Sequence, residues 1–100
     1  MDIIPEPIQF EWDKGNIDKN FKKHGVTNEE VEDVFTDNEI LVSEDTKHST
    51  KIEKRYRALG KTGQEKKLFI SFTIRDKKIR VISARPMSSK ERIVYEKKGI

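Results

Sequence analysis

The sequence predicts an α+β fold, with helices packed on one face of an antiparallel sheet, and three observations support this prediction. Apolar residues recur at helical spacing before residue 40, they alternate with polar residues between residues 52 and 85, and a capping signature begins a last helix at residue 88. The length of 100 residues fits a single domain over 1–100 with one core. Because helical and strand segments are segregated, the second face of the sheet is expected to meet water or a partner.

The first 25 residues are expected to form a lead-in, a short strand and a helix. Residues 1–7 contain two prolines and form the loose lead-in. The alternation of apolar and polar residues over 8–12 predicts a strand with one buried face. The helix expected over 13–25 begins at an aspartate suited to N-capping, places Ile17 and Phe21 on its apolar face, and ends at a glycine suited to a left-handed C-cap.

The next segment has the capping-box spacing, in which a threonine and a glutamate three residues later satisfy each other's backbone N–H groups. These residues are Thr27 and Glu30, and the apolar stripe behind them consists of Val31, Val34 and Phe35. The spacing predicts a short, acidic second helix.

Strand patterns follow, and a third helix closes the chain. Four strands are expected, at residues 40–42, 52–58, 68–75 and 78–85. A polar loop over 43–50 separates the first two strands, and a two-residue turn at 76–77 joins the last two. Pro86 ends the last strand, and the spacing of Ser88 and Glu91 is a second capping box, which predicts the C-terminal helix.

The composition excludes several classes of protein. With 39% charged residues and a mean hydropathy of −0.83, the sequence offers no apolar run of the roughly 18–20 residues that span a bilayer. We therefore expect a soluble, cytoplasmic protein without membrane contact. The sequence has no cysteine, which rules out a disulfide frame or a thiolate zinc site, and with two histidines any metal site would have to rely on carboxylates. We expect neither a metal nor a cofactor.

The net charge of +3 hides a strong asymmetry between the two halves of the chain. Residues 1–50 hold five Lys or Arg and thirteen Asp or Glu, whereas residues 51–100 hold sixteen and five. A basic half of this kind favours a polyanionic partner such as a nucleic acid. The alternative is that the basic residues are scattered over a solvated surface.

The polar face of the predicted sheet gathers charged residues from separate strands. On one strand these are Glu53, Arg55 and Arg57, and on the next they are Thr73 and Arg75. Arg80 and Arg85 have opposite parity on the last strand, so only one of them can join this face unless a bulge intervenes. Several guanidinium groups on one open face suit a phosphodiester. The alternative is ordinary surface ion pairing with Glu53, Glu91, Glu96 and the acidic first half.

The remaining candidates have a structural interpretation beside a functional one. His24 ends the first helix, where a charged histidine is stabilised by the helix dipole. His48 lies in a polar loop and is equally ambiguous. Trp12 is more often a core anchor than a platform on which an RNA base stacks. The sequence has no glycine-rich phosphate loop, no GxSxG motif and no cysteine nucleophile, which disfavours P-loop and covalent hydrolase chemistry.

Several short motifs resemble, in order, the BrnT family of bacterial toxins. They are Phe10-Glu11-Trp12-Asp13, Lys23-His24-Gly25-Val26, His48-Ser49, Glu53-Lys54-Arg55-Tyr56, Ala58-Leu59-Gly60, Thr73-x-Arg75, Ile79-Arg80-Val81-Ile82-Ser83-Ala84-Arg85, and Glu91-Arg92 with Tyr95-Glu96. The resemblance covers roughly 10–96, and the string from Ile79 to Arg85 is its most specific element.

This resemblance implies a RelE-like fold and a ribonuclease toxin of a type II toxin–antitoxin pair, which cuts RNA without a metal ion and arrests translation and growth. The expected antitoxin is a BrnA-like protein with a ribbon-helix-helix domain. Toxin and antitoxin together would form a heterotetramer that reaches operator DNA only through the antitoxin.

The site residues expected on this basis fall into two groups. Arg55, Arg75 and Arg85 would stabilise the charge that develops on the phosphate, Glu53 would serve as base, and His24 would move a proton. The residues expected to position RNA are Trp12, Lys23, Arg57 and Arg80. Two rival functions remain: a non-catalytic module that binds nucleic acid or protein through the same face, and a subunit that acts only through protein contacts.

Overall fold

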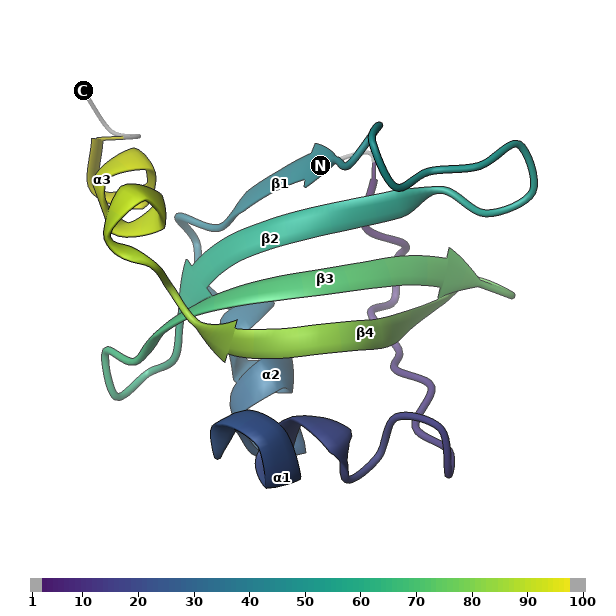
Figure 1. The fold of residues 1–100 in the computed structure, drawn as a ribbon, viewed down its shortest axis with the longest axis horizontal. Coiled ribbons are helices and arrows are strands. Elements are labelled where there is room, and N and C mark those ends of the chain that lie inside the picture. The colour runs from purple at the N-terminus through teal and green to yellow at the C-terminus, as the bar shows by residue number, and fades with distance from the viewer. Residues whose placement is uncertain (1–2, 98–100) are drawn as a thin grey trace.

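The computed structural model describes residues 3–97 and contains three helices and four strands within that range. In chain order these are α1 (Lys19–His24), α2 (Asn28–Val34), β1 (Leu41–Glu44), β2 (Arg55–Lys61), β3 (Lys67–Arg75), β4 (Lys78–Pro86) and α3 (Ser89–Lys97). The strands form one antiparallel sheet in the order β1-β2-β3-β4. As Figure 1 shows, α2 lies behind this sheet, α1 follows its β4 edge and α3 stands at one end. The predicted α+β fold is confirmed.

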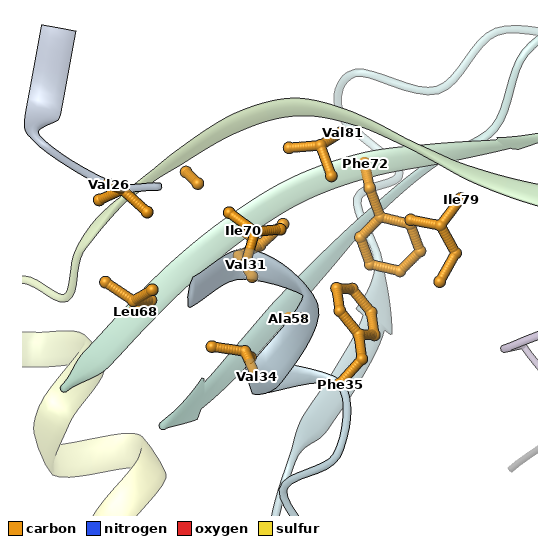
Figure 2. Close-up of a cluster of buried hydrophobic side chains, with 11 residues drawn as sticks. Val26, Val31, Val34, Phe35, Ala58, Leu68, Ile70, Phe72, Ile79 and Val81 are labelled. Atoms are coloured by element: carbon orange, nitrogen blue, oxygen red, sulfur yellow. The ribbon is translucent and has the colours of Figure 1, made fainter. Parts of the chain in front are cut away.

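The core lies between α2 and the sheet. Val31, Val34 and Phe35 point from α2 and the residue after it onto the strands, where they meet side chains such as Ile70 and Phe72 (Figure 2). All five residues are buried. Burying one such side chain contributes about 1.5–3 kcal/mol, so this layer supplies much of the stability.

The capping box that predicts α2 is present in the structure. Thr27 Oγ1 accepts from the Glu30 N–H at 3.1 Å, and Glu30 Oε1 accepts from the Thr27 N–H at 2.8 Å. The same arrangement begins α3, where Ser88 and Glu91 exchange hydrogen bonds of 2.8 and 3.2 Å. Both helix starts are therefore confirmed.

Helix α1 is shorter than predicted. Its N-cap is Asp18, whereas the carboxylate of Asp13 accepts from the Gly15 N–H at 2.8 Å and shapes a turn before the helix. Asp13 as N-cap is wrong because its side chain closes this turn instead. Gly25, with φ of 70°, is the left-handed C-cap as expected.

The apolar face predicted for α1 is also wrong. Ile17 and Phe21 are 42% and 61% exposed, whereas Asn16 and Asn20 are buried. Asn20 Oδ1 accepts from the Ala84 N–H at 2.9 Å, and Asn16 Nδ2 donates to a β4 carbonyl at 3.2 Å. Because β4 is an edge strand, its outward backbone groups need partners, and the asparagines of this segment supply them.

The strand predicted over 8–12 is reduced to one bridge. Phe10 pairs with Ile79 of β4 through two backbone hydrogen bonds. The Glu11 N–H donates to the Ile79 carbonyl at 2.9 Å, and the Ile79 N–H donates to the Gln9 carbonyl at 2.8 Å. The pairing stops there because the turn at Asp13 leads the chain away from the strand direction.

Strand β2 begins later than predicted. Ile52, expected at its start, is 99% exposed in a loop. The hydroxyl of Thr50 accepts from the Glu53 N–H at 2.9 Å, and that of Ser49 accepts from the Arg55 N–H at 2.9 Å. These side-chain hydrogen bonds replace the strand ladder over this stretch.

The last hairpin and the third helix follow the prediction. The turn at 76–77 has two residues, and both have positive φ, 52° and 64°. Helix α3 is anchored by Tyr95, whose hydroxyl donates to Asp37 Oδ2 at 2.6 Å. Burial and this carboxylate raise the pKa of Tyr95. No helix within residues 3–97 is long and apolar enough to cross a membrane.

Candidate active site

A bulge in β4 decides which side chains reach the face of the sheet that α2 does not cover. Ile82 is an extra residue in the pairing of β4 with β3, so the parity of the strand changes there. Arg80 consequently lies opposite Thr73, and Arg85 opposite Phe69. Paired residues on neighbouring strands point to the same face of the sheet. Thr73 and Phe69 alternate with the core residues Ile70 and Phe72, so both arginines lie on the face that α2 does not cover.

We call this surface the open face, the side of the sheet turned toward the viewer in Figure 1. Its charged members from β2, β3 and β4 are Arg55, Arg57, Lys61, Lys67, Arg75, Lys78, Arg80 and Arg85. The predicted gathering of guanidinium groups on one face is therefore present, and what distinguishes its members is the carboxylates around them.

At the hairpin end of the open face, two arginines share one carboxylate. Glu53 Oε1 lies 3.5 Å from Arg55 Nε, and Glu53 Oε2 lies 3.4 Å from Arg75 Nη2. Both contacts exceed the 2.7–2.9 Å of a strong charge-assisted hydrogen bond. Thr73, which is buried, donates to the Lys54 carbonyl at 2.8 Å and so holds the loop that carries Glu53 against β3. The three side chains carry one excess positive charge, which suits an anion.

At the edge of the sheet, Arg80 is engaged by acidic residues of the N-terminal segment. Its guanidinium lies 2.6 and 3.1 Å from the Asp13 carboxylate and 3.5 Å from Glu11. The hydrogen bond from Arg80 lowers the pKa of Asp13, and Asp13 raises that of Arg80. With two carboxylates around one guanidinium, this position is not left with excess positive charge.

At the far end of the sheet, Arg85 is held by α3. It makes two parallel hydrogen bonds with Glu91, of 2.8 and 2.9 Å, and its guanidinium lies 4.2 Å from the centre of the Phe69 ring. The hydrogen bond with Glu91 raises the pKa of Arg85. Phe69, the partner of Arg85, is six residues from Arg75 on β3, about 20 Å along the strand. The structure does not bring Arg85 together with the hairpin-end arginines.

Three other predicted residues lie away from the open face. Trp12 donates its indole N–H to Glu32 of α2 at 2.7 Å and stacks on Phe10 at 6.2 Å, on the side of the sheet that the helices cover. Lys23 and His24 end α1, beside the β4 edge. Of the predicted residues, the structure thus brings together Glu53, Arg55 and Arg75, with Arg57 next to Arg55 on the same face of β2.

The structure adds the pair of Asp45 and His48 to this end of the open face, whereas the sequence had left the role of His48 open. The Asp45 N–H donates to the Arg55 carbonyl at 2.7 Å, so the pairing of β1 with β2 extends by one step and places Asp45 beside Arg55 and Arg57 on the open face. His48 Nδ1 lies 2.7 Å from Asp45 Oδ2. The hydrogen bond from His48, helped by the charge of Arg57, lowers the pKa of Asp45. The alternation of β1, continued into the loop, was the signal available in the sequence.

The described residues offer no ready metal centre. Among residues 3–97, no three His, Cys, Asp or Glu side chains gather as metal ligands would. The side chains gathered at the hairpin end are cations, the Glu53 carboxylate, and the Asp45 carboxylate with the His48 imidazole.

Residues 12–91, more than half of the chain, match the model of a protein family described as the ribonuclease toxin BrnT of type II toxin–antitoxin systems. No curated protein sequence gives a significant match. The matched range includes all four strands, the shared carboxylate and the loop that carries His48.

Proposed function

The chain belongs to the BrnT family of type II ribonuclease toxins, and we propose on this basis that it cuts RNA without a metal ion at the hairpin end of the open face. The observation that supports this location is the single carboxylate of Glu53 between the guanidinium groups of Arg55 and Arg75. This is the part of the open face where cations exceed the carboxylates that contact them.

In the proposed reaction the 2′-oxygen of RNA attacks the adjacent phosphate. The O2′–P bond forms, the P–O5′ bond breaks, and the products end in a 2′,3′-cyclic phosphate and a 5′-hydroxyl. Negative charge builds on the phosphoryl oxygens, and Arg55 and Arg75 are placed to stabilise it. A preorganised donor of this kind is worth roughly 3–4 kcal/mol in the transition state.

Glu53 takes the proton of the 2′-hydroxyl in this proposal. Its carboxylate is 35% exposed and is oriented by the two arginines, which hold it next to the phosphate they would bind. Arg57, exposed and one position along the face from Arg55, is placed to bind a neighbouring phosphate of the same RNA.

The geometry favours structural roles for the other predicted residues. Arg80 attaches the N-terminal segment to β4, Arg85 attaches α3, and Trp12 packs beside α2. Lys23 and His24 end α1, which bonds through Asn20 to Ala84 near the α3 end of β4, whereas Arg75 lies at the hairpin end of β3.

The family also suggests how the activity is used. A toxin of this kind would arrest translation and growth until an antitoxin covers its basic face. We propose a BrnA-like antitoxin with a ribbon-helix-helix domain, which would form a heterotetramer with the toxin and carry operator-DNA binding.

The test is incubation of the purified protein with a defined RNA, followed by separation of the fragments and analysis of their ends. Fragments with cyclic phosphate and 5′-hydroxyl ends are expected from the wild type, and from Arg75→Ala they should form about 10²–10³-fold more slowly. Arg92→Ala, which removes an exposed arginine of α3, is the matched control and should cut like the wild type. Binding that weakens with salt but yields no fragments would instead identify a non-catalytic module.

A further inference from the structure

The loop between β1 and β2 is fastened to the start of β2 at several points. Ser49 Oγ accepts from the Arg55 N–H at 2.9 Å and donates to the Asp45 carbonyl at 2.8 Å. The Thr50 N–H donates to the Glu53 carbonyl at 2.8 Å. These bonds fix the loop's position relative to the strand that carries Arg55.

Within this loop, Asp45 and His48 form an oriented pair. Their 2.7 Å contact uses Nδ1 of the imidazole, so Nε2 is the nitrogen directed away from the carboxylate. The Asp45 side chain is 14% exposed and that of His48 is 59% exposed. A carboxylate on one imidazole nitrogen fixes the orientation of the ring, while the other nitrogen is presented to solvent.

The pair stands beside the shared carboxylate. Asp45, Arg55 and Thr73 occupy neighbouring positions on three adjacent strands, with about 4.8 Å between strands. His48 and Arg75 therefore lie on opposite sides of Arg55. The imidazole contacts the Asp45 carboxylate, and the positive charge of Arg57 acts on that same carboxylate. An RNA phosphate held at Arg55 would have Glu53 toward β3 and the imidazole toward β1.

We propose that His48, oriented by Asp45, donates the proton that the departing 5′-oxygen needs, an inference that rests on the RNA cleavage proposed above. The 2′ proton goes to Glu53 as the O2′–P bond forms. The Nε2 proton of His48 goes to O5′ as the P–O5′ bond breaks. The second transfer leaves a neutral imidazole, and histidine suits this role because it is the side chain most often used for proton transfer to or from a reacting group. Asp45 acts as a positioning residue.

The experiment compares two RNAs of one sequence, cut by the wild type, His48→Ala and Asp45→Asn. One RNA is unmodified, and the other carries sulfur in place of the 5′-oxygen at the linkage that the wild type cuts. A thiolate leaves without being protonated, so the second RNA does not need a general acid. Thr46→Ala, a small change at an exposed position of the same loop, is the control.

We expect His48→Ala to cut the unmodified RNA about 10²–10⁴-fold more slowly and to cut the sulfur-containing RNA at close to the wild-type rate. Asp45→Asn should show a smaller loss on the unmodified RNA, because the imidazole loses the carboxylate that orients it, and it should cut the sulfur-containing RNA at close to the wild-type rate. Full activity of His48→Ala, or an equal loss on both RNAs, would overturn the role of His48 while wild-type cleavage stands. A wild type that cuts neither RNA would overturn the proposed function itself.

Discussion

The two ends of the open face use the same chemical pair in different ways. At the hairpin end, Glu53 is shared by Arg55 and Arg75 at 3.4–3.5 Å. At the other end, Arg85 and Glu91 are matched one to one by two bonds of 2.8 and 2.9 Å. The first arrangement leaves positive charge unmatched, whereas the second is neutral.

The difference teaches that the number of arginines on a surface does not by itself locate a phosphate site. Glu91 also accepts from the Ser88 N–H at 2.8 Å, so the pair with Arg85 ties the first turn of α3 to the sheet. Glu53 belongs to a loop and starts no helix. An arginine with a full set of partners fastens the fold, and an arginine that shares a partner is available to a ligand.

Arg75→Ala should break the hairpin end with the largest effect on activity. We expect RNA cleavage to fall about 10²–10³-fold because a donor to the transition-state phosphate is lost. The free energy of unfolding should hardly change, since the Arg75 side chain is half exposed and its contact with Glu53 is long. Rates under single-turnover conditions and a urea unfolding curve give both quantities. Cleavage within threefold of the wild type would contradict the assignment.

Arg85→Ala should show the reverse pattern. We expect the free energy of unfolding to fall by about 1–2 kcal/mol, because Glu91 loses a two-bond partner in a half-buried position. Cleavage by the folded protein should change less than tenfold. Arg85→Lys keeps the charge without the planar fork and should recover only part of the stability. A folded Arg85→Ala protein that has lost its cleavage would place the active site across both ends.

Local signals in the sequence were sufficient for the helices whose starts they define. The capping boxes of Thr27 with Glu30 and of Ser88 with Glu91 depend on residues three apart. Such contacts form within one turn, so the sequence alone predicted where α2 and α3 begin.

Tertiary demands that the sequence does not display account for the errors. Helical spacing alone predicted that Ile17 and Phe21 are buried. The backbone groups on the free edge of β4 instead need hydrogen-bond partners, and polar side chains such as Asn20 supply them. Ile52 similarly followed the strand alternation, but Thr50 and Ser49 take the backbone hydrogen bonds of that stretch.

The site was predicted in part for the same reason. Alternation correctly placed Arg55 and Arg57 on one face, because parity is a local property. It gave no sign of the bulge at Ile82, which brings both Arg80 and Arg85 to that face. Which carboxylate each arginine meets depends on segments remote in sequence, and this pairing separates structural from candidate catalytic arginines.

A pH series should sharpen the contrast at the α3 end. The hydrogen bond from Arg85, aided by the Ser88 N–H and opposed by burial, lowers the pKa of Glu91 below its ordinary 4.5. A lowered folded-state pKa contributes stability that is complete above about pH 5 and is lost as the pH falls through the folded value. Glu91→Gln should remove this contribution and so flatten the acid side of the stability curve. The check is to measure the free energy of unfolding of the wild type and of Glu91→Gln between pH 7 and pH 3. Parallel curves for the two proteins would contradict the pairing of Arg85 with Glu91.

Removal of divalent metal ions should have the smallest effect, and it tests the hairpin end directly. Glu53 faces two guanidinium groups, and their charge opposes the approach of a divalent cation to the carboxylate. With arginines supplying the positive charge, we expect cleavage in excess chelator to match cleavage in magnesium within about twofold, a barrier difference below about 0.5 kcal/mol. Heat-denatured protein in each buffer corrects for background hydrolysis. A strict need for magnesium would mean that the Glu53 carboxylate binds a metal ion in the complex with RNA. Arg55 and Arg75 would then position the RNA strand instead of stabilising the transition state.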